Sequence, residues 1–283
     1  MKTILFPTDF TNTTLPALDW VKLLAKRFGA AVTIMHAYQP MIPDTTLPTM
    51  GDLGAGVAAS RDLEEISREN LADLANRLQA EGLSVQTEWR IGGVEDEIMD
   101  VARAIQADLI VTGRSELNTF FDRLAGSAAA DIALEAPCPV LVVPHDGDEP
   151  RPAALQTIVY ASQLEFEEQH LLRRTLDIAR QFGATVNVLH VEAENQPSLF
   201  DDEQFLAMMQ REYGTEKLEV KRVKARTVTG GITDYLDNNP ADLIVMSTRE
   251  RSFLTGLLNP SLTERMILRA SVPVLVYHHQ SVL

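Results

Sequence analysis

The chain has 283 residues, of which 45% are hydrophobic, and its formal net charge at pH 7 is -15. This length suffices for two ordinary domains, although a single larger α/β domain also fits it. The negative charge argues against general binding to nucleic acid or to an anionic membrane, because both need dense Lys and Arg to neutralise phosphates.

Two features of the chain bear on its compartment. The apolar run in MKTILFPTDF is too short for a signal peptide, and no stretch approaches the length of a membrane span. We therefore expect a cytoplasmic protein. The single cysteine, Cys138, excludes an intramolecular disulfide, and its place in the apolar run APCPVLVV predicts a buried structural thiol rather than a nucleophile.

In chain order, short β-branched runs alternate with longer segments of helical period. This alternation is typical of βαβ units and of a parallel sheet covered on both faces. In the first half we predict strands at residues 3–7, 32–36, 85–89, 109–112 and 140–143.

The clearest helix lies in SRDLEEISRENLADLANRLQAEG, where Gly82 is expected to end it. Its apolar residues recur at helical spacing: Leu63, Ile66, Leu71, Leu74 and Leu78. Residues 39–56, rich in Pro and Gly, are predicted to form a surface loop.

The sequence contains an internal repeat that spans nearly the whole chain. KTILFPTDF and AKRFGAAVTIMHAY return as QTIVYASQL and ARQFGATVNVLHVE at an offset of 154, and ADLIVTGR and PCPVLVV return as ADLIVMST and SVPVLVY at an offset of 134. We therefore predict domains 1–144 and 155–283, joined by a linker at 145–154. Each would be an α/β domain with a doubly wound, open, parallel five-stranded sheet, and the two would be related by a pseudo-two-fold axis.

The final strands, VLVV and VLVY, would lie at sheet edges that have to be paired, covered or blunted. The two copies can pair with each other at these edges inside one chain. Further assembly into a homodimer is compatible with this arrangement.

Ligands of open parallel sheets bind outside the carboxyl ends of the strands, so the residues that follow strands are the candidate site. Pro7, Thr8 and Asp9 follow the first strand, and Ala37 follows the second. Asp9 could accept hydrogen bonds from a base or from hydroxyls. The alternative is that Asp9 caps the following helix, and the two roles are compatible.

The segment TGRSELNTFFDRLAGS lacks Gly-Lys-Ser/Thr, so a P-loop hydrolase is not expected. Gly113 permits a close turn after its strand. Gly126 and Ser127 are expected to begin a helix that runs to Glu135, whose free N–H groups and dipole offer an anion site. The alternative is a glycine turn followed by an ordinary serine N-cap.

PTDF after the first strand, and G-x2-(E)-x9-G-S followed by PCPVLVV, resemble the universal stress protein family, and the whole chain resembles its tandem form. The resemblance implies binding of ATP or AMP, with Mg accompanying ATP. Asp9 would face the base or ribose, and Ala37 would offer its backbone to adenine. The resemblance also places other residues around the sugar and phosphates: Thr112, Gly113, Gly126, Ser127 and Ala128.

Glu116 stands where the nucleotide-binding members of the family have their second glycine. Its charge would repel phosphate by on the order of one to a few kcal/mol, so affinity for a triphosphate would fall roughly ten- to several-hundredfold. Arg114 and Arg123 could neutralise Glu116 or reach the phosphate themselves. The predicted phosphate site therefore keeps the first and last glycines of the motif, but its middle position carries a charged side chain.

The second copy departs further from the family motif, and we expect it to bind no nucleotide by the family mode. Gln163 replaces the aspartate, while Ser247, Glu250 and Pro260 replace the three glycines. Pro260 has no N–H to offer to a phosphate.

Other polar residues do not form a legible catalytic or metal site. His36 and His190 occupy equivalent positions but lack companion ligands at metal spacing, so structural histidines are expected. The leading hypothesis is a non-enzymatic, cytoplasmic stress-response protein that senses adenine nucleotide through its first half and acts on a protein partner that the sequence does not identify. The alternatives are a nucleotide-independent partner-binding scaffold and slow ATP hydrolysis.

Overall fold

The computed structural model describes residues 1–39, 53–114, 120–145, 154–164, 168–194, 211, 218–248 and 262–278. The predicted linker (except residues 145 and 154), most of the predicted surface loop, Glu116, Glu250 and Pro260 lie outside these ranges. The first half consists of β1 (Thr3–Pro7), η1 (Asn12–Thr14), α1 (Leu15–Phe28), β2 (Ala31–Tyr38), α2 (Leu53–Ala80), β3 (Val85–Ile91), α3 (Val94–Ala104), β4 (Leu109–Arg114), α4 (Phe120–Glu135) and β5 (Val140–Pro144).

The second half follows this order of elements, except that η1 and α2 have no counterpart among the described residues. It consists of β6 (Thr157–Ala161), α5 (Gln169–Phe182), β7 (Thr185–Ala193), β8 (Leu218–Ala225), α7 (Val228–Asn238), β9 (Leu243–Thr248), α8 (Leu262–Arg269) and β10 (Val274–His278). The predicted alternation of strands and helices is confirmed in the first half and, outside the segment between β7 and β8, in the second.

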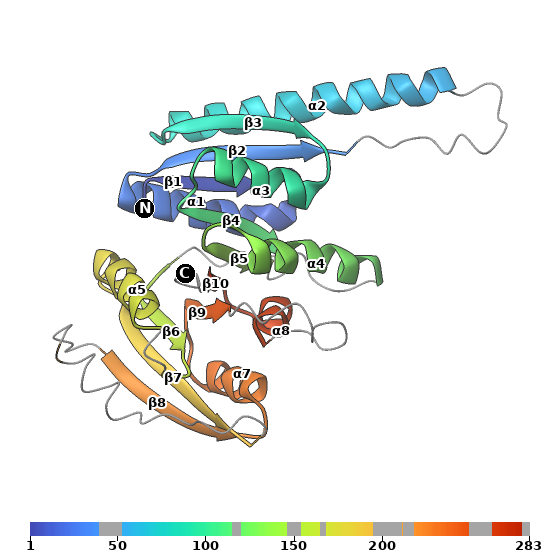
Figure 1. Cartoon of the computed structure of the whole chain (residues 1–283). Helices are drawn as coiled ribbons and strands as arrows, with labels where there is room; N and C mark the ends of the chain where they lie inside the picture. Colours follow the sequence, from blue (N-terminus) through green and yellow to red (C-terminus); the bar gives the residue numbers. More distant parts are fainter. Residues whose placement is uncertain are drawn as a thin grey trace.

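The strands of both halves form one ten-stranded sheet in the order β3-β2-β1-β4-β5-β10-β9-β6-β7-β8 (Figure 1). Pairing is parallel within each half, and β5 and β10 join the halves in antiparallel register. Leu275 pairs with Leu141, its own counterpart at the offset of 134, so a pseudo-two-fold axis passes through this pair. The predicted fold class and the predicted intramolecular edge pairing are therefore confirmed.

Helices cover both faces of the sheet, because the strands are apolar on both sides. Ile4 and Phe6 point into a core shared with α1, α2 and α5, whereas Leu5 points into a core shared with α3, α4, α7 and α8. Both cores continue from the first half into the second. The halves thus share their hydrophobic cores instead of packing as separate bodies.

The long helix α2 differs from its prediction at one end. It begins at Leu53, so the predicted loop ends earlier than expected, and it ends before Gly82, which adopts a φ of 87° as a C-terminal stop requires. Leu63 and Ile66 are 49% and 52% exposed, and only the later apolar positions of the stripe are buried. The apolar period is therefore correct, but the N-terminal part of the helix extends beyond the sheet (Figure 1).

Four strands run further than predicted at their carboxyl ends. β2 continues to Tyr38, β3 to Ile91, β4 to Arg114 and β5 to Pro144. Neighbouring strands supply partners for these extra residues, as when Gly113 and Arg114 pair with Val143 and Pro144. Pairing across the sheet, which local sequence does not encode, sets these ends.

Side chains at the ends of β4 and β10 bind across the junction between the halves. Arg114 donates from Nη1 to the Leu268 carbonyl at 2.6 Å and from Nη2 to the Ala270 carbonyl at 2.7 Å, where it caps the end of α8. His278, at the end of β10, donates from Nε2 to the Ala133 carbonyl of α4 at 3.0 Å. Each half thus holds a helix of the other.

We expect the burial of His278 to make the folded protein less stable in acid. Burial lowers the pKa of His278 and outweighs the backbone carbonyls of Ala133 and Cys138, which raise it. Because the folded pKa lies below the unfolded value of about 6.5, this stability is present above pH 6.5 and is lost as pH falls below it. Urea unfolding between about pH 7.5 and about pH 5.5 should show a smaller loss for His278→Gln than for the wild type; parallel profiles would contradict this expectation.

Candidate functional site

The chain order reverses beside β1, which lies between β2 and β4. In open parallel sheets ligands bind outside the carboxyl ends of the strands at such a point. Asp9 follows β1 there, and Gly113 and Arg114 end β4. The structure therefore brings the predicted residues of strands one and four to one edge of the sheet.

The turn after β1 holds the carboxylate of Asp9 at the surface. Asp9 Oδ1 accepts hydrogen bonds from Thr11 N at 3.0 Å and from Thr11 Oγ1 at 2.7 Å. The helix-capping alternative is wrong, because the N-cap residues of η1 and α1 are Thr11 and Thr14. Asp9 instead closes a local turn that fixes its own side chain.

A buried hydroxyl and a left-handed residue shape the same turn. Thr8 is 7% exposed and its Oγ1 accepts from Phe10 N at 3.0 Å, while Phe10 adopts a φ of 62°. His36 Nδ1 donates to the Thr8 carbonyl at 2.8 Å, and its ring centroid lies 4.7 Å from that of Phe10. His36 therefore supports the turn, which confirms the expected structural role.

Gly113 is required by packing against η1. A Cβ at this position would lie 2.7 Å from the Thr13 carbonyl oxygen and 3.2 Å from Thr14 Cα, and both of these are backbone atoms. Only glycine lets the end of β4 approach η1 this closely. The space beside Gly113 where a side chain would lie is occupied by protein.

Other predicted site residues lie in several environments. Pro7 is buried at the end of β1, and Thr112 is buried within β4, two residues before its end. Ala37 is half-buried and pairs with Arg90 of β3, and Ala128 is half-buried within α4. Arg114 belongs to the junction between the halves, where its two N–H groups meet α8.

The predicted helix start at Gly126 and Ser127 is wrong. α4 begins at Phe120, so both residues lie inside the helix. The segment FFDRLA contains residues that a helix tolerates, and one interior glycine costs only about 1 kcal/mol. The N–H groups without intrahelical partners therefore belong to the first turn from Phe120 onward, not to Gly126.

In the second half a buried carboxylate occupies the corresponding turn. Glu168 is 4% exposed; its Oε2 accepts from Ser162 Oγ at 2.5 Å and from Gln163 N at 3.2 Å, and its Oε1 accepts from Ser247 Oγ at 3.2 Å. It bridges the ends of β6 and β9, the counterparts of β1 and β4. In this half the side chain of Glu168 therefore occupies the point where the strand order reverses, which is where a ligand would bind.

The frame of the turn is otherwise the same in both halves. Ser162 Oγ accepts from Leu164 N at 2.8 Å, Leu164 has a φ of 60°, and His190 Nδ1 donates to the Ser162 carbonyl at 3.1 Å. Glu168 stands at the offset of 154 from Thr14. Aligning the two copies through this turn could have drawn attention to Glu168, which sequence reasoning missed.

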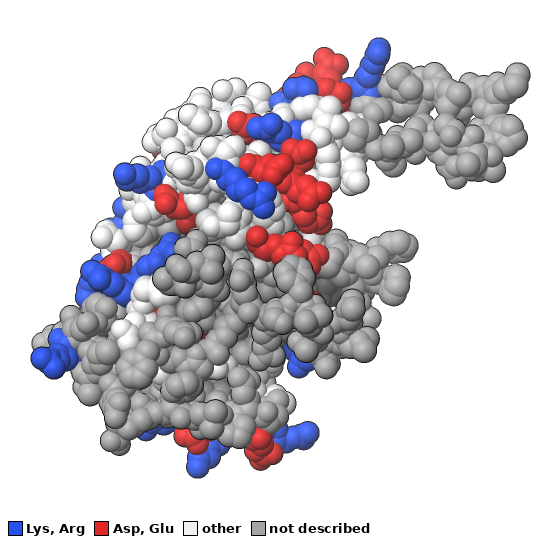
Figure 2. Space-filling model, in the orientation of Figure 1, with Lys and Arg blue, Asp and Glu red and all other residues white. Residues whose placement is uncertain are grey.

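Acidic residues gather beside the candidate site. Figure 2 shows Asp and Glu clustered over α3, whose first turn contains Glu95, Asp96 and Glu97. Burial, and then repulsion from Glu95, raise the pKa of Asp131 on α4. This surface disfavours a free polyanion unless cations accompany it.

Two further expectations concern chemistry away from this turn. Cys138 is buried, and burial raises the pKa of its thiol to about 12, which confirms a structural cysteine. Within the described ranges, no group of His, Cys, Asp and Glu is arranged to hold a metal ion. The described helices include none that is both long and apolar enough to span a bilayer.

Comparison with known proteins identifies the family. The model of the universal stress protein family matches residues 1–144 and again residues 155–278, so the chain belongs to that family in tandem form. A universal stress protein of Methanocaldococcus jannaschii is 32% identical over 142 residues, which cover 50% of this chain and 81% of that protein. One from Mycolicibacterium smegmatis is 23% identical over 295 residues and covers 96% of both chains.

A solved structure supports the fold over the whole length. The crystal structure of a universal stress protein from Archaeoglobus fulgidus matches with a TM-score of 0.75 and covers 98% of each chain at 18% identity. At this identity the likeness concerns the arrangement of the elements alone.

We predict that Gly113→Ala destabilises the protein by about 1–3 kcal/mol, because the new methyl group meets the backbone of η1. Gly93→Ala is the matched control, since a Cβ there comes no closer than 3.4 Å to another atom. Urea unfolding would measure both variants. Equal stability of Gly113→Ala and the wild type would show that η1 moves away at little cost.

We predict that Glu168→Ala destabilises the protein by about 2–4 kcal/mol, because the hydroxyls of Ser162 and Ser247 lose a charged acceptor inside the protein. Thr14→Ala, at the matching position of the first half, should cost less than about 1 kcal/mol, since Thr14 is only half-buried. The measurement is again urea unfolding, and equal losses in the two variants would contradict the assignment of Glu168.

Proposed function

We infer that the protein binds an adenine nucleotide, ATP or AMP with Mg²⁺ accompanying ATP, in its first half only. In this proposal the protein is a cytoplasmic stress-response sensor, and the nucleotide is a regulatory ligand, not a substrate. Family membership supports the nucleotide class, and the geometry beside β1 supports the location.

The observation that carries the proposal is the state of Asp9 at the switch point between β1 and β4. Its Oδ1 is held by Thr11, while its Oδ2 accepts no hydrogen bond from any residue that the structure describes. An exposed, oriented carboxylate oxygen suits the hydroxyls of a ribose or the amino group of a base. The local turn fixes this oxygen before a ligand arrives, which lowers the entropic cost of binding.

The contrast with the second half supports a single site. Gln163 replaces Asp9 there, and the Glu168 carboxylate lies buried between the ends of β6 and β9. A nucleotide in that half would have to displace a buried charge from its hydrogen-bond donors. The cost of leaving such donors unpaired disfavours binding.

The phosphate side is less favourable than the nucleoside side. Glu116 and the acidic first turn of α3 would oppose phosphates, and repulsion grows with phosphate number. Mg²⁺ would offset part of this charge. We therefore expect affinity to depend mainly on the adenosine part, with a smaller gain from each added phosphate than in members with the full glycine motif.

A conformational role follows from α4. Contact between phosphates and the N–H groups of Gly126 and Ser127 requires the first turns of α4 to open, because these groups lie within the helix. α4 accepts the hydrogen bond of His278 from the second half. Opening would give free and bound states different interfaces, and such differential binding is what a regulatory ligand needs.

A second candidate function is a partner-binding scaffold that does not use nucleotide. Two observations favour it: α4 already encloses Gly126 and Ser127, and two N–H groups of Arg114 are committed to α8. Purification without added nucleotide, heat extraction and mass analysis separate the two functions. Retained AMP or ATP favours sensing, whereas an empty protein without a thermal shift under excess ATP favours the scaffold.

We predict that Asp9→Ala weakens both AMP and ATP by about tenfold, while Glu116→Gly tightens ATP by about tenfold and AMP less. The reason is that Asp9 acts on the nucleoside and Glu116 on the phosphates. Calorimetry with AMP and with ATP plus Mg²⁺ would measure the four affinities.

Gln163→Ala is the control for this experiment, because it alters the second-half counterpart of Asp9 and should leave both affinities unchanged. Unchanged binding in Asp9→Ala would overturn the location of the site. A loss in Gln163→Ala would instead place the nucleotide in the second half.

A further inference from the structure

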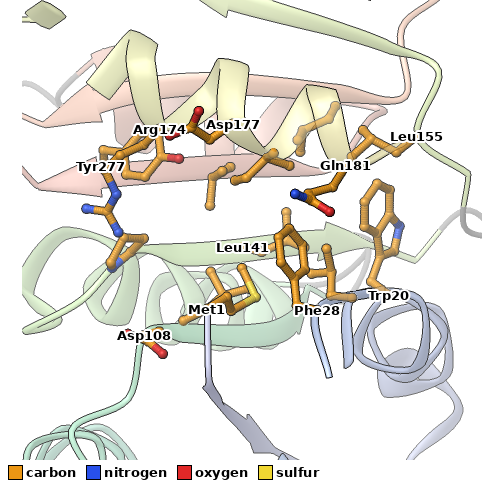
Figure 3. A pocket seen from close by; sticks show the side chains of 16 residues that line it. Met1, Trp20, Phe28, Asp108, Leu141, Leu155, Arg174, Asp177, Gln181 and Tyr277 are labelled. Carbon is orange, nitrogen blue, oxygen red and sulfur yellow. The ribbon is translucent and has the colours of Figure 1, made fainter. Parts of the chain in front are cut away.

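A cavity of about 400 Å³ lies between the two halves, on the face covered by α1 and α5 (Figure 3). It lies at the opposite end of β1 and β4 from Asp9, because Met1, Asp108 and Leu109 line it at the starts of these strands. Its volume falls in the range of small-molecule sites. It is therefore distinct from the proposed nucleotide site.

The cavity lies at the pseudo-two-fold axis, since Leu141 and Leu275 both line it and pair with each other. Its ends nevertheless differ. Arg174 occupies the position of Trp20 at the offset of 154, and Tyr277 occupies that of Val143 at the offset of 134. The repeats have thus diverged at the two ends: Figure 3 shows Trp20 and Phe28 toward one end, with the amide of Gln181 beside Trp20, and the charged Arg174 with Tyr277 at the other.

The walls between these ends are apolar. Trp20 and Leu24 are 5% and 4% exposed on α1, and Ile178 on α5 faces them from the second half. Leu141 and Leu275 contribute from the sheet. Such walls suit an aliphatic chain, whose burial is favourable at about 25 cal/mol per Å².

The polar end holds a hydroxyl that lacks an acceptor. Tyr277 is 2% exposed, and its oxygen has no partner at hydrogen-bonding geometry within the described residues. The side chain of Thr175 approaches the hydroxyl and lowers the pKa of Tyr277, but it lies outside hydrogen-bonding geometry and donates its own hydrogen to the Leu171 carbonyl at 3.0 Å. Burial raises the pKa of Tyr277 to about 12, so the hydroxyl keeps its proton at neutral pH and can donate it.

Arg174 supplies a cation over the ring of Tyr277. Its Cζ lies 5.0 Å from the centre of the Tyr277 ring, and in the described part of the chain it forms no ion pair. The two carboxylates at the mouth already have donors: Asp108 accepts from the backbone N–H groups of Lys2 and Thr3, and Asp177 pairs with Arg180 at 3.0 Å. Arg174 attracts the Asp108 carboxylate, and helps to lower its pKa, without forming an ion pair with it, so its N–H groups are available to a ligand carboxylate.

We propose that this cavity binds an amphipathic carboxylate of the medium-chain fatty-acid class. The carboxylate accepts hydrogen bonds from the Arg174 guanidinium and the Tyr277 hydroxyl, and the chain lies between α1 and α5 toward Trp20. A carboxylate satisfies the buried hydroxyl and the free cation together, which an uncharged alkyl chain does not.

The chain contains two tryptophans, Trp20 and Trp89, so one of them can report on the cavity. The probe is decanoate carrying bromine on its terminal carbon, which quenches tryptophan on contact, used below its micelle-forming concentration. In Trp89→Phe, where only Trp20 emits, we expect saturable quenching. In Trp20→Phe, where only Trp89 emits, we expect none. Calorimetry of the wild type with unlabelled decanoate checks the affinity independently.

Three variants test the polar end. Arg174→Gln should weaken decanoate about tenfold or more, and Tyr277→Phe should weaken it by a smaller factor. Arg173→Gln is the matched control, because Arg173 neighbours Arg174 on α5 and is exposed like it, but does not line the cavity. Decanol, the uncharged analogue, should bind the wild type at least about tenfold more weakly than decanoate.

Three results would overturn the proposal. Absence of quenching together with no calorimetric heat shows that the cavity binds no such ligand. Equal quenching in Trp20→Phe places the ligand elsewhere. Equal affinity for decanol and decanoate, with Arg174→Gln unchanged, leaves an apolar cavity without the proposed carboxylate recognition.

Discussion

The antiparallel pairing of β5 with β10 is the interaction on which the rest of the molecule depends. Both faces of these strands are packed, so either strand left as an edge would expose backbone groups beside an apolar core. Joining them makes one sheet and two continuous cores. The register, symmetric about Leu141 and Leu275, also fixes which helices meet: α1 and α5 both line the axial cavity, and α4 packs against α8 on the other face.

Within this shared frame the two halves have kept their scaffold and changed the residues that could face a ligand. Each keeps a hydroxyl after its first strand, a left-handed residue two positions later and a histidine bonded to the same carbonyl. Thr14 and Gly113 of the first half are Glu168 and Ser247 in the second. Ser247 donates a hydrogen bond to Glu168, so the buried carboxylate of the second half has a donor that the first half lacks at this position.

Sequence predicted the features that repeat or alternate. Strand cores, the two-fold repetition and the pairing of VLVV with VLVY follow from β-branched runs and an apolar edge. It did not predict features decided by distant contacts. α4 begins at Phe120 because the helix extends toward the N-terminus past Ser127, a serine that resembles a helix cap. The hydrogen bonds of Arg114 depend on α8, whose Leu268 is 154 residues away in the sequence. Glu168 was missed because no motif marks a carboxylate buried by its own fold.

The proposed nucleotide site and the cavity at the pseudo-two-fold axis lie at opposite ends of β4. The strand itself is not expected to transmit a conformational change between them. Coupling between sites needs an element with two arrangements, and β4 is paired on both sides and buried on both faces. α4 has the means to change, because its first turn precedes an interior glycine and its far end meets His278. A nucleotide-driven change would therefore appear on the face of α4 and α8, while the cavity on the face of α1 and α5 would keep its shape.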